Sequence, residues 1–268
     1  MKILLTNDDG VNSAGIQSLA YELAARGSLT AVIAPDRERS GMGHAITVTR
    51  PVRVNLLEHG AFPDGASVYS CDGTPTDCVT IGLDLLFPQA DFVVSGPNQG
   101  PNLGDDVTYS GTVCAAMEGV ILGRPSLAVS LASEPADGVR HNASASFAAL
   151  AVLDYLDENP LPDGVLLNVN VPNKPISEIK GFQLTRRGIR RYMEKFTSMK
   201  DPHGRDCFWI SGKIDDVIDE GTDVTAVKHG FISVTPIHMD MTLYSLLEKM
   251  KTSGVESRLA DALDDRQG

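Results

Sequence analysis

Two adjacent carboxylates follow the first apolar run of the chain. Residues 2–6 have the short apolar pattern of a buried strand, and residues 7–10, Asn-Asp-Asp-Gly, come directly after it. Such a tetrapeptide is typical of a turn. Asp8 and Asp9 repel each other, however, unless a cation or a hydrogen-bond donor lies between them. The pair therefore indicates a divalent cation, and the oxygen-only donors of this loop favour Mg²⁺ or Mn²⁺ over Zn²⁺.

A second charged loop, residues 35–43, follows the apolar run of residues 29–34. Its basic residues, its glycines and the hydroxyl of Ser40 suit a phosphate group, although a solvated surface loop explains the same composition equally well. Asp36 stands where an acid grips a ribose in dinucleotide-binding folds. His44, just beyond the loop, is a candidate proton donor, but a single histidine near a loop is more often structural.

A third loop, residues 95–106, contains three glycines interleaved with Asn98 and Asn102. Loops of this length within a domain tend to be functional, and glycines allow the backbone to approach a ligand closely. Shortly afterwards Ser110 or Thr112 begins a predicted helix, where free N–H groups and the helix dipole favour an anion. An ordinary helix cap is the commoner use of a hydroxyl at such a position, and both uses are compatible.

These loops need a scaffold, and the chain alternates short apolar runs with helical patterns as a parallel α/β sheet requires. We predict a doubly wound fold, in which ligands bind at the carboxyl ends of the strands. The strands are expected at residues 2–6, 29–34, 47–57, 67–71, 92–94, 126–131 and 164–169, and the helices at residues 15–26, 75–86, 111–122 and 142–156.

The sequence changes character after Pro172. Residues 1–172 are expected to form the Rossmann-like core, and residues 173–242 an appendage of strands and loops that returns to it at residues 231–236. Residues 243–268 are expected to form an amphipathic helix and a frayed tail. A basic cluster within the appendage (Arg186, Arg187, Arg190 and Arg191) suits a solvated face, an anion-facing rim or pairing with acidic residues.

The composition excludes several classes of protein. The 268 residues include 23 Lys and Arg against 35 Asp and Glu, a net charge of −12 that argues against binding to nucleic acid or to a membrane surface. Every apolar run is shorter than the roughly 18 residues of a spanning helix. The four cysteines lack the spacing of a metal site. We therefore expect a cytoplasmic protein with reduced cysteines.

Two other functional classes compete with a metal-dependent enzyme as explanations of these loops. A nicotinamide-dependent oxidoreductase would carry a glycine fingerprint after the first strand, where this chain has Asn7, Asp8 and Asp9. A non-catalytic nucleotide-binding module would keep the glycine-rich loops but would have no need of adjacent carboxylates. The second class remains the alternative.

Several longer strings together resemble the stationary-phase survival protein SurE family of nucleotidases. They are residues 7–10, 35–41, 73–78 and 95–118, and the similarity extends from the first residue to about Thr242. The resemblance implies a Rossmann-like three-layer αβα domain. It also implies an extended, β-rich C-terminal part exchanged between subunits, which gives homodimers or homotetramers. Pro97 departs from the aliphatic residue expected in many relatives.

The activity implied by the resemblance is hydrolysis of nucleoside 5′- and 3′-monophosphates, with short-chain polyphosphate as a further substrate of some members. One divalent cation per subunit, Mg²⁺ or Mn²⁺, would be bound by Asp8, Asp9, Ser40 and Asn98. In our hypothesis the substrate phosphate bridges this cation and the helix start formed by Ser110, Gly111 and Thr112, and Asn102 orients it. Attack by water and a covalent aspartyl-phosphate on Asp8 or Asp9 both remain open.

Overall fold

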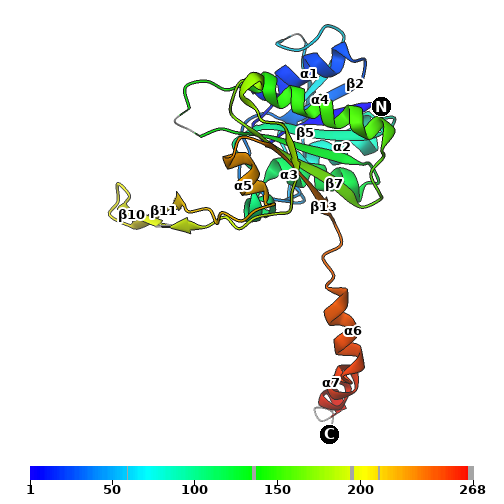
Figure 1. The fold of residues 1–268 in the computed structure, drawn as a ribbon, viewed down its shortest axis with the longest axis vertical. Helices are drawn as coiled ribbons and strands as arrows, with labels where there is room; N and C mark the ends of the chain where they lie inside the picture. Colours follow the sequence, from blue (N-terminus) through cyan, green and yellow to red (C-terminus); the bar gives the residue numbers. More distant parts are fainter. Residues whose placement is uncertain (59, 135–136, 194–195, 211, 265–268) are drawn as a thin grey trace. The chain divides into compact units, whose positions relative to one another are not determined.

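The computed structural model describes residues 1–58, 60–134, 137–193, 196–210 and 212–264. The chain divides into two units, Met1–Ile237 and His238–Gly268. The first unit contains the large sheet of the protein and the helices that cover it (Figure 1). Among the helices of the described ranges, none combines the length and the apolar character that crossing a membrane would require.

A nine-stranded sheet confirms the predicted α/β class. Its strand order is β3-β4-β2-β1-β5-β6-β7-β13-β8. The pairs from β4 through β7 are parallel, as is the pair β8 and β13, whereas the edge strand β3 is antiparallel to β4. In sheet order the strands span Val54–Leu56, Ser67–Cys71, Leu29–Pro35, Ile3–Thr6, Phe92–Gln99, Ser126–Ala132, Val165–Pro172, Ile232–His238 and Phe182–Leu184.

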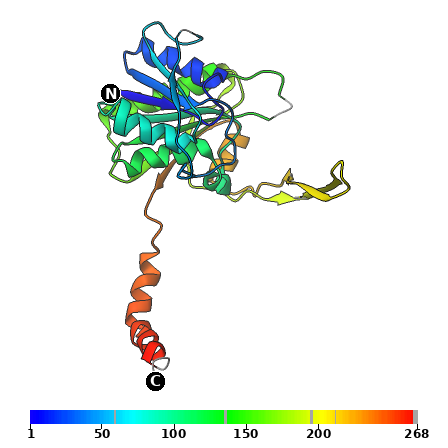
Figure 2. The same cartoon turned by 180° about the vertical axis from the view of Figure 1, so that it is seen from behind.

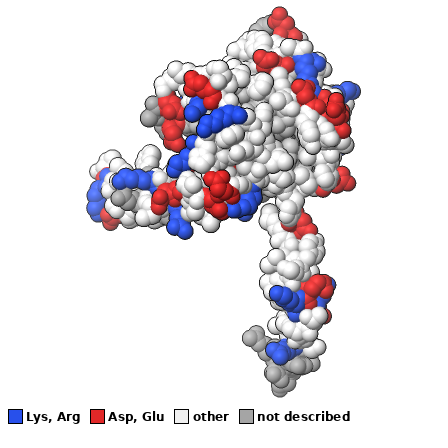
Figure 3. All heavy atoms as spheres, in the orientation of Figure 1, with Lys and Arg blue, Asp and Glu red and all other residues white. Residues whose placement is uncertain are grey.

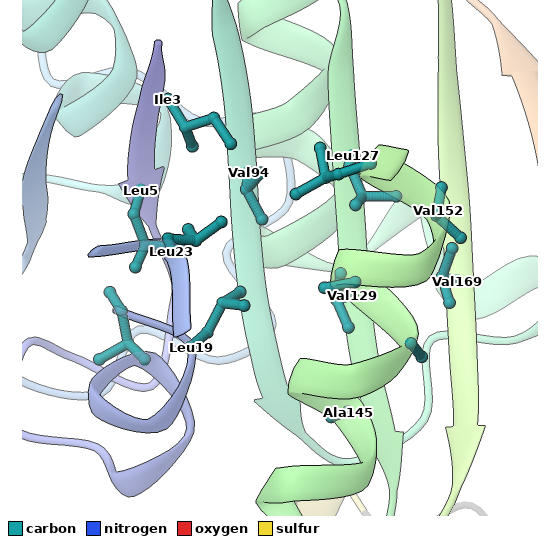
Figure 4. Close-up of a cluster of buried hydrophobic side chains, with 14 of the residues drawn as sticks. Ile3, Leu5, Leu19, Leu23, Val94, Leu127, Val129, Ala145, Val152 and Val169 are labelled. Carbon is teal, nitrogen blue, oxygen red and sulfur yellow. The ribbon is translucent and has the colours of Figure 1, made fainter. Parts of the chain in front are cut away.

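Helices cover both faces of this sheet and complete three layers (Figures 1 and 2). Helices α1 (Ala14–Ala25) and α4 (Asn142–Glu158) pack on one face, and α2 (Pro75–Ile81) and α3 (Gly111–Ile121) pack on the other. Figure 4 shows Leu19 and Leu23 of α1 beside the side chains of the central strands. The apolar face of α1 is fully buried, and its members are Ile16, Leu19, Ala20 and Leu23.

The prediction of a strand at residues 47–57 is wrong for most of these residues, because β3 covers only Val54–Leu56. Side chains rather than a neighbouring strand hold the preceding backbone. The Thr47 N–H donates to Asp77 Oδ1 at 2.9 Å, and the Arg53 N–H donates to Asp72 Oδ1 at 2.9 Å. Pro51 between them has no N–H to offer a sheet.

Two other elements differ from their predicted bounds. The helix expected to reach residue 86 ends at Ile81 and continues as a π-helical turn, η1 (Gly82–Leu86), which is closed by the Phe87 N–H donating to the Gly82 carbonyl at 2.7 Å. The strand expected at residues 92–94 extends to Gln99, with a shift of register between Ser95 and Asn98. The third loop is therefore shorter than its sequence suggests.

The segment after β7 returns twice to the large sheet, through β8 and β13. Between these strands it forms an arm, defined here as residues 190–216. The arm contains β9 (Tyr192–Met193) paired with β12 (Lys213–Ile214), and β10 (Phe196–Lys200) paired with β11 (Asp206–Ile210). Figures 1 and 2 show the β10–β11 hairpin projecting from the body of the first unit. The helix α5 (Asp223–Lys228) follows the arm.

Acidic and basic side chains alternate along the arm in Figure 3. Two arginines of the predicted basic cluster form ion pairs, Arg190 within the arm and Arg186 just before it. Arg186 pairs with Asp219, and the buried Arg190 pairs with Asp106 at 3.0 Å and Asp216 at 3.2 Å. For these two residues, pairing with acids is thus the interpretation that holds.

The second unit contains α6 (Tyr244–Thr252) and α7 (Val255–Asp264). The amphipathic helix is confirmed as α6. The prediction of a frayed tail after it is wrong as far as Asp264. The chain turns at Gly254, which has a positive φ of 73°, and a second helix follows. Residues 265–268 lie outside the described part of the chain.

Candidate active site

Three loops meet at the carboxyl ends of β2, β1 and β5, which are neighbours in the sheet. The turn after β1 is fixed by the buried Asn7 side chain. Its amide donates to the Gly10 carbonyl at 3.0 Å and accepts from the Gly10 N–H at 3.2 Å. Gly10 has a φ of 95°, and an added Cβ would lie 3.0 Å from the Arg37 backbone. The turn and the second loop are therefore packed directly against each other.

Asp8 is almost completely buried at this junction, with 4% of its surface exposed. Its Oδ1 accepts a hydrogen bond from the Thr112 hydroxyl at the start of α3. The absence of a side chain at Gly111 makes this approach possible, since a Cβ there would lie 2.8 Å from Asp8 Cβ. Burial, which disfavours the charged form, raises the pKa of Asp8 above its ordinary value.

Asp9 lies beside it and is held by β5, because the Gln99 N–H donates to Asp9 Oδ2 at 2.9 Å. Burial, followed by repulsion from Asp8, raises the pKa of Asp9 to about 7. In the part of the chain that the structure describes, neither carboxylate forms an ion pair. The positive charge of Arg140 lowers the pKa of Asp9, but by less than burial and Asp8 raise it. Two adjacent carboxylates with so little compensating positive charge are the arrangement that a bound cation relieves.

Asp9 sets an expected pH dependence of stability in metal-free protein. Its pKa is about 7 in the folded state against 3.8 for a free carboxyl, so the folded state binds the proton more tightly. The stability contributed by protonated Asp9 is fully present below about pH 4 and is lost as the pH rises through about 7. The loss is on the order of 4 kcal/mol.

Urea denaturation in EDTA from pH 4 to pH 8 measures this loss as the difference in free energy of unfolding between wild type and Asp9→Asn. We expect the variant to become the more stable protein as the pH rises. A difference that is constant across the range would contradict the assignment.

The other two expected ligands offer neutral oxygens. The Ser40 hydroxyl donates to Glu38 Oε1 at 2.7 Å, and the Asn98 amide donates to the Gly100 carbonyl at 2.8 Å. The described residues contain no group of three or more His, Cys, Asp or Glu side chains arranged to hold a metal ion. A cation here would thus bind two carboxylates and neutral oxygens, which is a donor set that Mg²⁺ or Mn²⁺ accepts and Zn²⁺ does not prefer.

A cavity of about 520 Å³ opens beside these loops. Five of the eight residues predicted from the sequence line it, namely Asp8, Ser40, Asn98, Asn102 and Ser110. The remaining three, Asp9, Gly111 and Thr112, do not line the cavity: Asp9 is held by Gln99, and Gly111 and Thr112 contact Asp8. The three predicted loops therefore meet at one cavity, and the Thr112 hydroxyl is directed to the Asp8 carboxylate.

Ser110 caps α3, since its Oγ accepts from the Val113 N–H at 3.0 Å. It also lines the cavity, so the helix cap and the position predicted to bind an anion coincide at this helix start. His44 has a different role, because its Nε2 lies 2.9 Å from Glu118 Oε2 and Glu118 also accepts from Thr80. These bonds agree with a structural histidine.

Asn102 is held in place by two buried asparagines of β7 that sequence reasoning missed. Asn170 accepts from the Asn102 N–H at 2.8 Å, and both Asn168 and Asn170 donate to the Asn102 carbonyl. The Asn102 amide donates to Ser130 Oγ at 2.8 Å. The sequence did contain a signal for these residues, because two asparagines within an apolar, buried strand need hydrogen-bond partners.

The far side of the cavity was also missed. It is formed by Tyr192, Phe196, Ile210 and Gly212 of the arm. More than 80 residues separate these side chains from Ser110, and no local pattern marked them as part of the site.

Comparison with known proteins identifies the family of this chain. The family model described as survival protein SurE matches residues 3–194. The chain belongs to the SurE family. It is 46% identical over 252 residues to a 5′-nucleotidase SurE of Legionella pneumophila strain Lens, covering 93% of this chain and 96% of the relative. It is 48% identical to a 5′-nucleotidase SurE of Geobacter sulfurreducens, covering 94% and 93%.

A solved SurE structure shows the same fold. The Sure protein from Aquifex aeolicus superposes with a TM-score of 0.79 at 38% identity, and the match covers 94% of this chain and 99% of that one. The resemblance drawn from the sequence strings is thereby confirmed.

Proposed function

We propose that this SurE family member is a phosphatase that releases phosphate from nucleoside 5′- and 3′-monophosphates and uses one divalent cation, Mg²⁺ or Mn²⁺. The observation that carries the proposal is the adjacent pair formed by the buried Asp8 and the partly buried Asp9, near a cavity that also contains a helix start at Ser110. Relatives at 46% and 48% identity are named 5′-nucleotidase SurE, which supports the substrate class. The proposal includes short-chain polyphosphate as a further substrate of the same site.

The cation would be held by Asp8, Asp9, Ser40 and Asn98. When bound, it supplies positive charge to the phosphoryl group and polarises water for attack. The protein prepares this position with side chains that are already fixed: Thr112 orients Asp8, and the Gln99 N–H orients Asp9. The attacking group is water or, in the competing mechanism, a carboxylate of Asp8 or Asp9, which would leave a phosphorylated protein.

The phosphate would be bound at the start of α3. The chain carries a net charge of −12, so the attraction must be local. The Val113 N–H of the first helical turn is bonded to Ser110 and the Thr112 N–H to Asp8, so the attraction for an anion there comes mainly from the helix dipole. Gly111 and Thr112 act indirectly in this arrangement, by bringing Asp8 against the helix start. Asn102 presents a fixed backbone beside them, as its bonds to Asn168 and Asn170 require.

The proposal is tested by phosphate release from a panel of 5′- and 3′-nucleoside monophosphates and a short polyphosphate, each with Mg²⁺, Mn²⁺ or EDTA. We expect release from monophosphates with either metal and none above background in EDTA. Folded protein that binds nucleotides but releases no phosphate with any metal would support the non-catalytic binding module instead.

We also propose that the protein acts in the cytoplasm as a homodimer or homotetramer that exchanges C-terminal segments. The four cysteines are free thiols, as a reducing compartment favours. The arm and α6 expose large apolar side chains, among them Phe208, Trp209 and Leu246, which a second copy of the chain would cover.

A further inference from the structure

The cavity beside Asp8 is lined by two kinds of group that come from different parts of the chain. The loops after β1, β2 and β5 and the start of α3 contribute carboxylate, hydroxyl and amide groups, where the proposed function places the phosphate. The arm contributes the rings of Tyr192 and Phe196 and the aliphatic side chain of Ile210. A nucleoside monophosphate has the same division, with a charged phosphate at one end and a flat, largely apolar base at the other.

The Tyr192 ring is held in position by a polar network around the buried Arg190. Its hydroxyl donates to Asp106 Oδ2 at 2.5 Å, and Arg190 Nη1 donates to the same oxygen at 3.0 Å. Arg190 also donates to Asp216 at 3.2 Å, and its side chain is only 5% exposed. Asp106 belongs to η2 (Gly104–Thr108), the 3₁₀ turn that leads into Ser110. The network therefore connects the ring to the turn that precedes the proposed phosphate position.

Phe196 and Ile210 face each other across the β10–β11 ladder. They are 64% and 81% exposed, so their apolar surfaces lie in water when the cavity holds no ligand. Exposed apolar groups that line a cavity together with polar groups are typical of a ligand site. A nucleobase fits this surface, because stacking on aromatic rings needs only the flat face of the base.

We infer that the arm binds the nucleobase of the substrate, with the base stacked against Tyr192 and Phe196 and the phosphate directed toward Asp8 and Ser110. The inference rests on the proposed function and adds the part of the protein that distinguishes nucleotides from other phosphate monoesters. Because stacking does not read the edge of the base, the site accepts purines and pyrimidines alike. Tyr192 is a binding residue here, and Arg190 and Asp106 are positioning residues.

The test compares adenosine 5′-monophosphate with ribose 5-phosphate, which keeps the sugar and the phosphate but lacks the base. In Phe196→Ala we expect the ratio of kcat/KM for the nucleotide to that for the sugar phosphate to fall about tenfold, mainly through a higher KM for the nucleotide. Phe196→Trp restores a ring and should recover most of that ratio.

Trp209→Ala is the matched control, because Trp209 lies in the same hairpin, is 67% exposed and does not line the cavity. This variant should keep the wild-type ratio. An unchanged ratio in Phe196→Ala would overturn the inference, as would an equal loss for both substrates. If light scattering shows that Phe196→Ala changes the oligomer and Trp209→Ala lowers the ratio equally, the apolar surface belongs to a contact between copies and the inference fails. Absence of phosphate release from either substrate in the wild type would instead refute the proposed function.

Discussion

Asp8→Asn is expected to lower kcat/KM for nucleoside monophosphates by on the order of a thousandfold at saturating Mg²⁺ or Mn²⁺, which corresponds to about 4 kcal/mol of transition-state stabilisation. The substitution replaces a buried carboxylate at the proposed cation with a neutral amide. The amide oxygen can still accept the hydrogen bond from Thr112, so the fold should be retained. Phosphate release and circular dichroism measure the two effects separately.

Asp105→Asn is the control for this experiment. Asp105 is an exposed carboxylate in η2, outside the cavity wall, and it carries the same charge. It should stay within about twofold of wild type, because surface charge acts weakly through solvent. If Asp8→Asn retained more than a tenth of the wild-type rate, the carboxylate would not be required and the proposed cation site would be wrong.

Asp223→Ala is expected to lower the free energy of unfolding by about 3 kcal/mol or more. The Asp223 side chain is fully buried and accepts three backbone hydrogen bonds, from Gly104 at 2.9 Å, Gly188 at 2.7 Å and Val224 at 2.8 Å. Alanine would leave all three N–H groups without an acceptor. Because Gly104 begins the turn that precedes Ser110, the KM for substrate should rise as well.

Urea denaturation measures the stability change, and Asp219→Ala is the comparison. Asp219 is about half exposed, and its side chain pairs with Arg186 at the surface, where an ion pair contributes roughly 0 to 1 kcal/mol. Equal losses in the two variants would show that the three backbone bonds add nothing beyond a surface charge.

The sequence predicted the core well because its signal is local. The apolar runs at β1, β2, β6 and β7 and the face of α1 depend on periodicity within a few residues. Thr74 and Asp77 have the spacing of a helix start, which is also a local pattern, and the structure shows both hydrogen bonds of this capping box. The strand prediction failed at residues 47–53 because the apolar and β-branched residues there are typical of a strand. Its backbone is instead bonded to the Asp72 and Asp77 side chains, which come more than 18 residues later.

The candidate site likewise has features that the sequence predicts and features that it does not. Asp8, Ser40 and Asn98 could be grouped because parallel strands bring their carboxyl ends to one edge of the sheet. The orientation of Thr112 toward Asp8 depends on how closely α3 approaches β1, which Gly111 permits and no spacing rule supplies. The contribution of Tyr192 depends on contacts with Asp106, 86 residues earlier, and such contacts leave no periodic trace.

The two kinds of group that line the cavity belong to different parts of the architecture. Asp8 and Asn98 are attached to the central strands of the nine-stranded sheet, whereas Phe196 and Ile210 come from the hairpin outside it. Under the proposed function, substitutions in the hairpin change the choice of leaving group without disturbing the carboxylates proposed to act on the phosphate. During evolution, substitutions in the arm would then change the range of substrates, while the central strands would keep the catalytic groups in place.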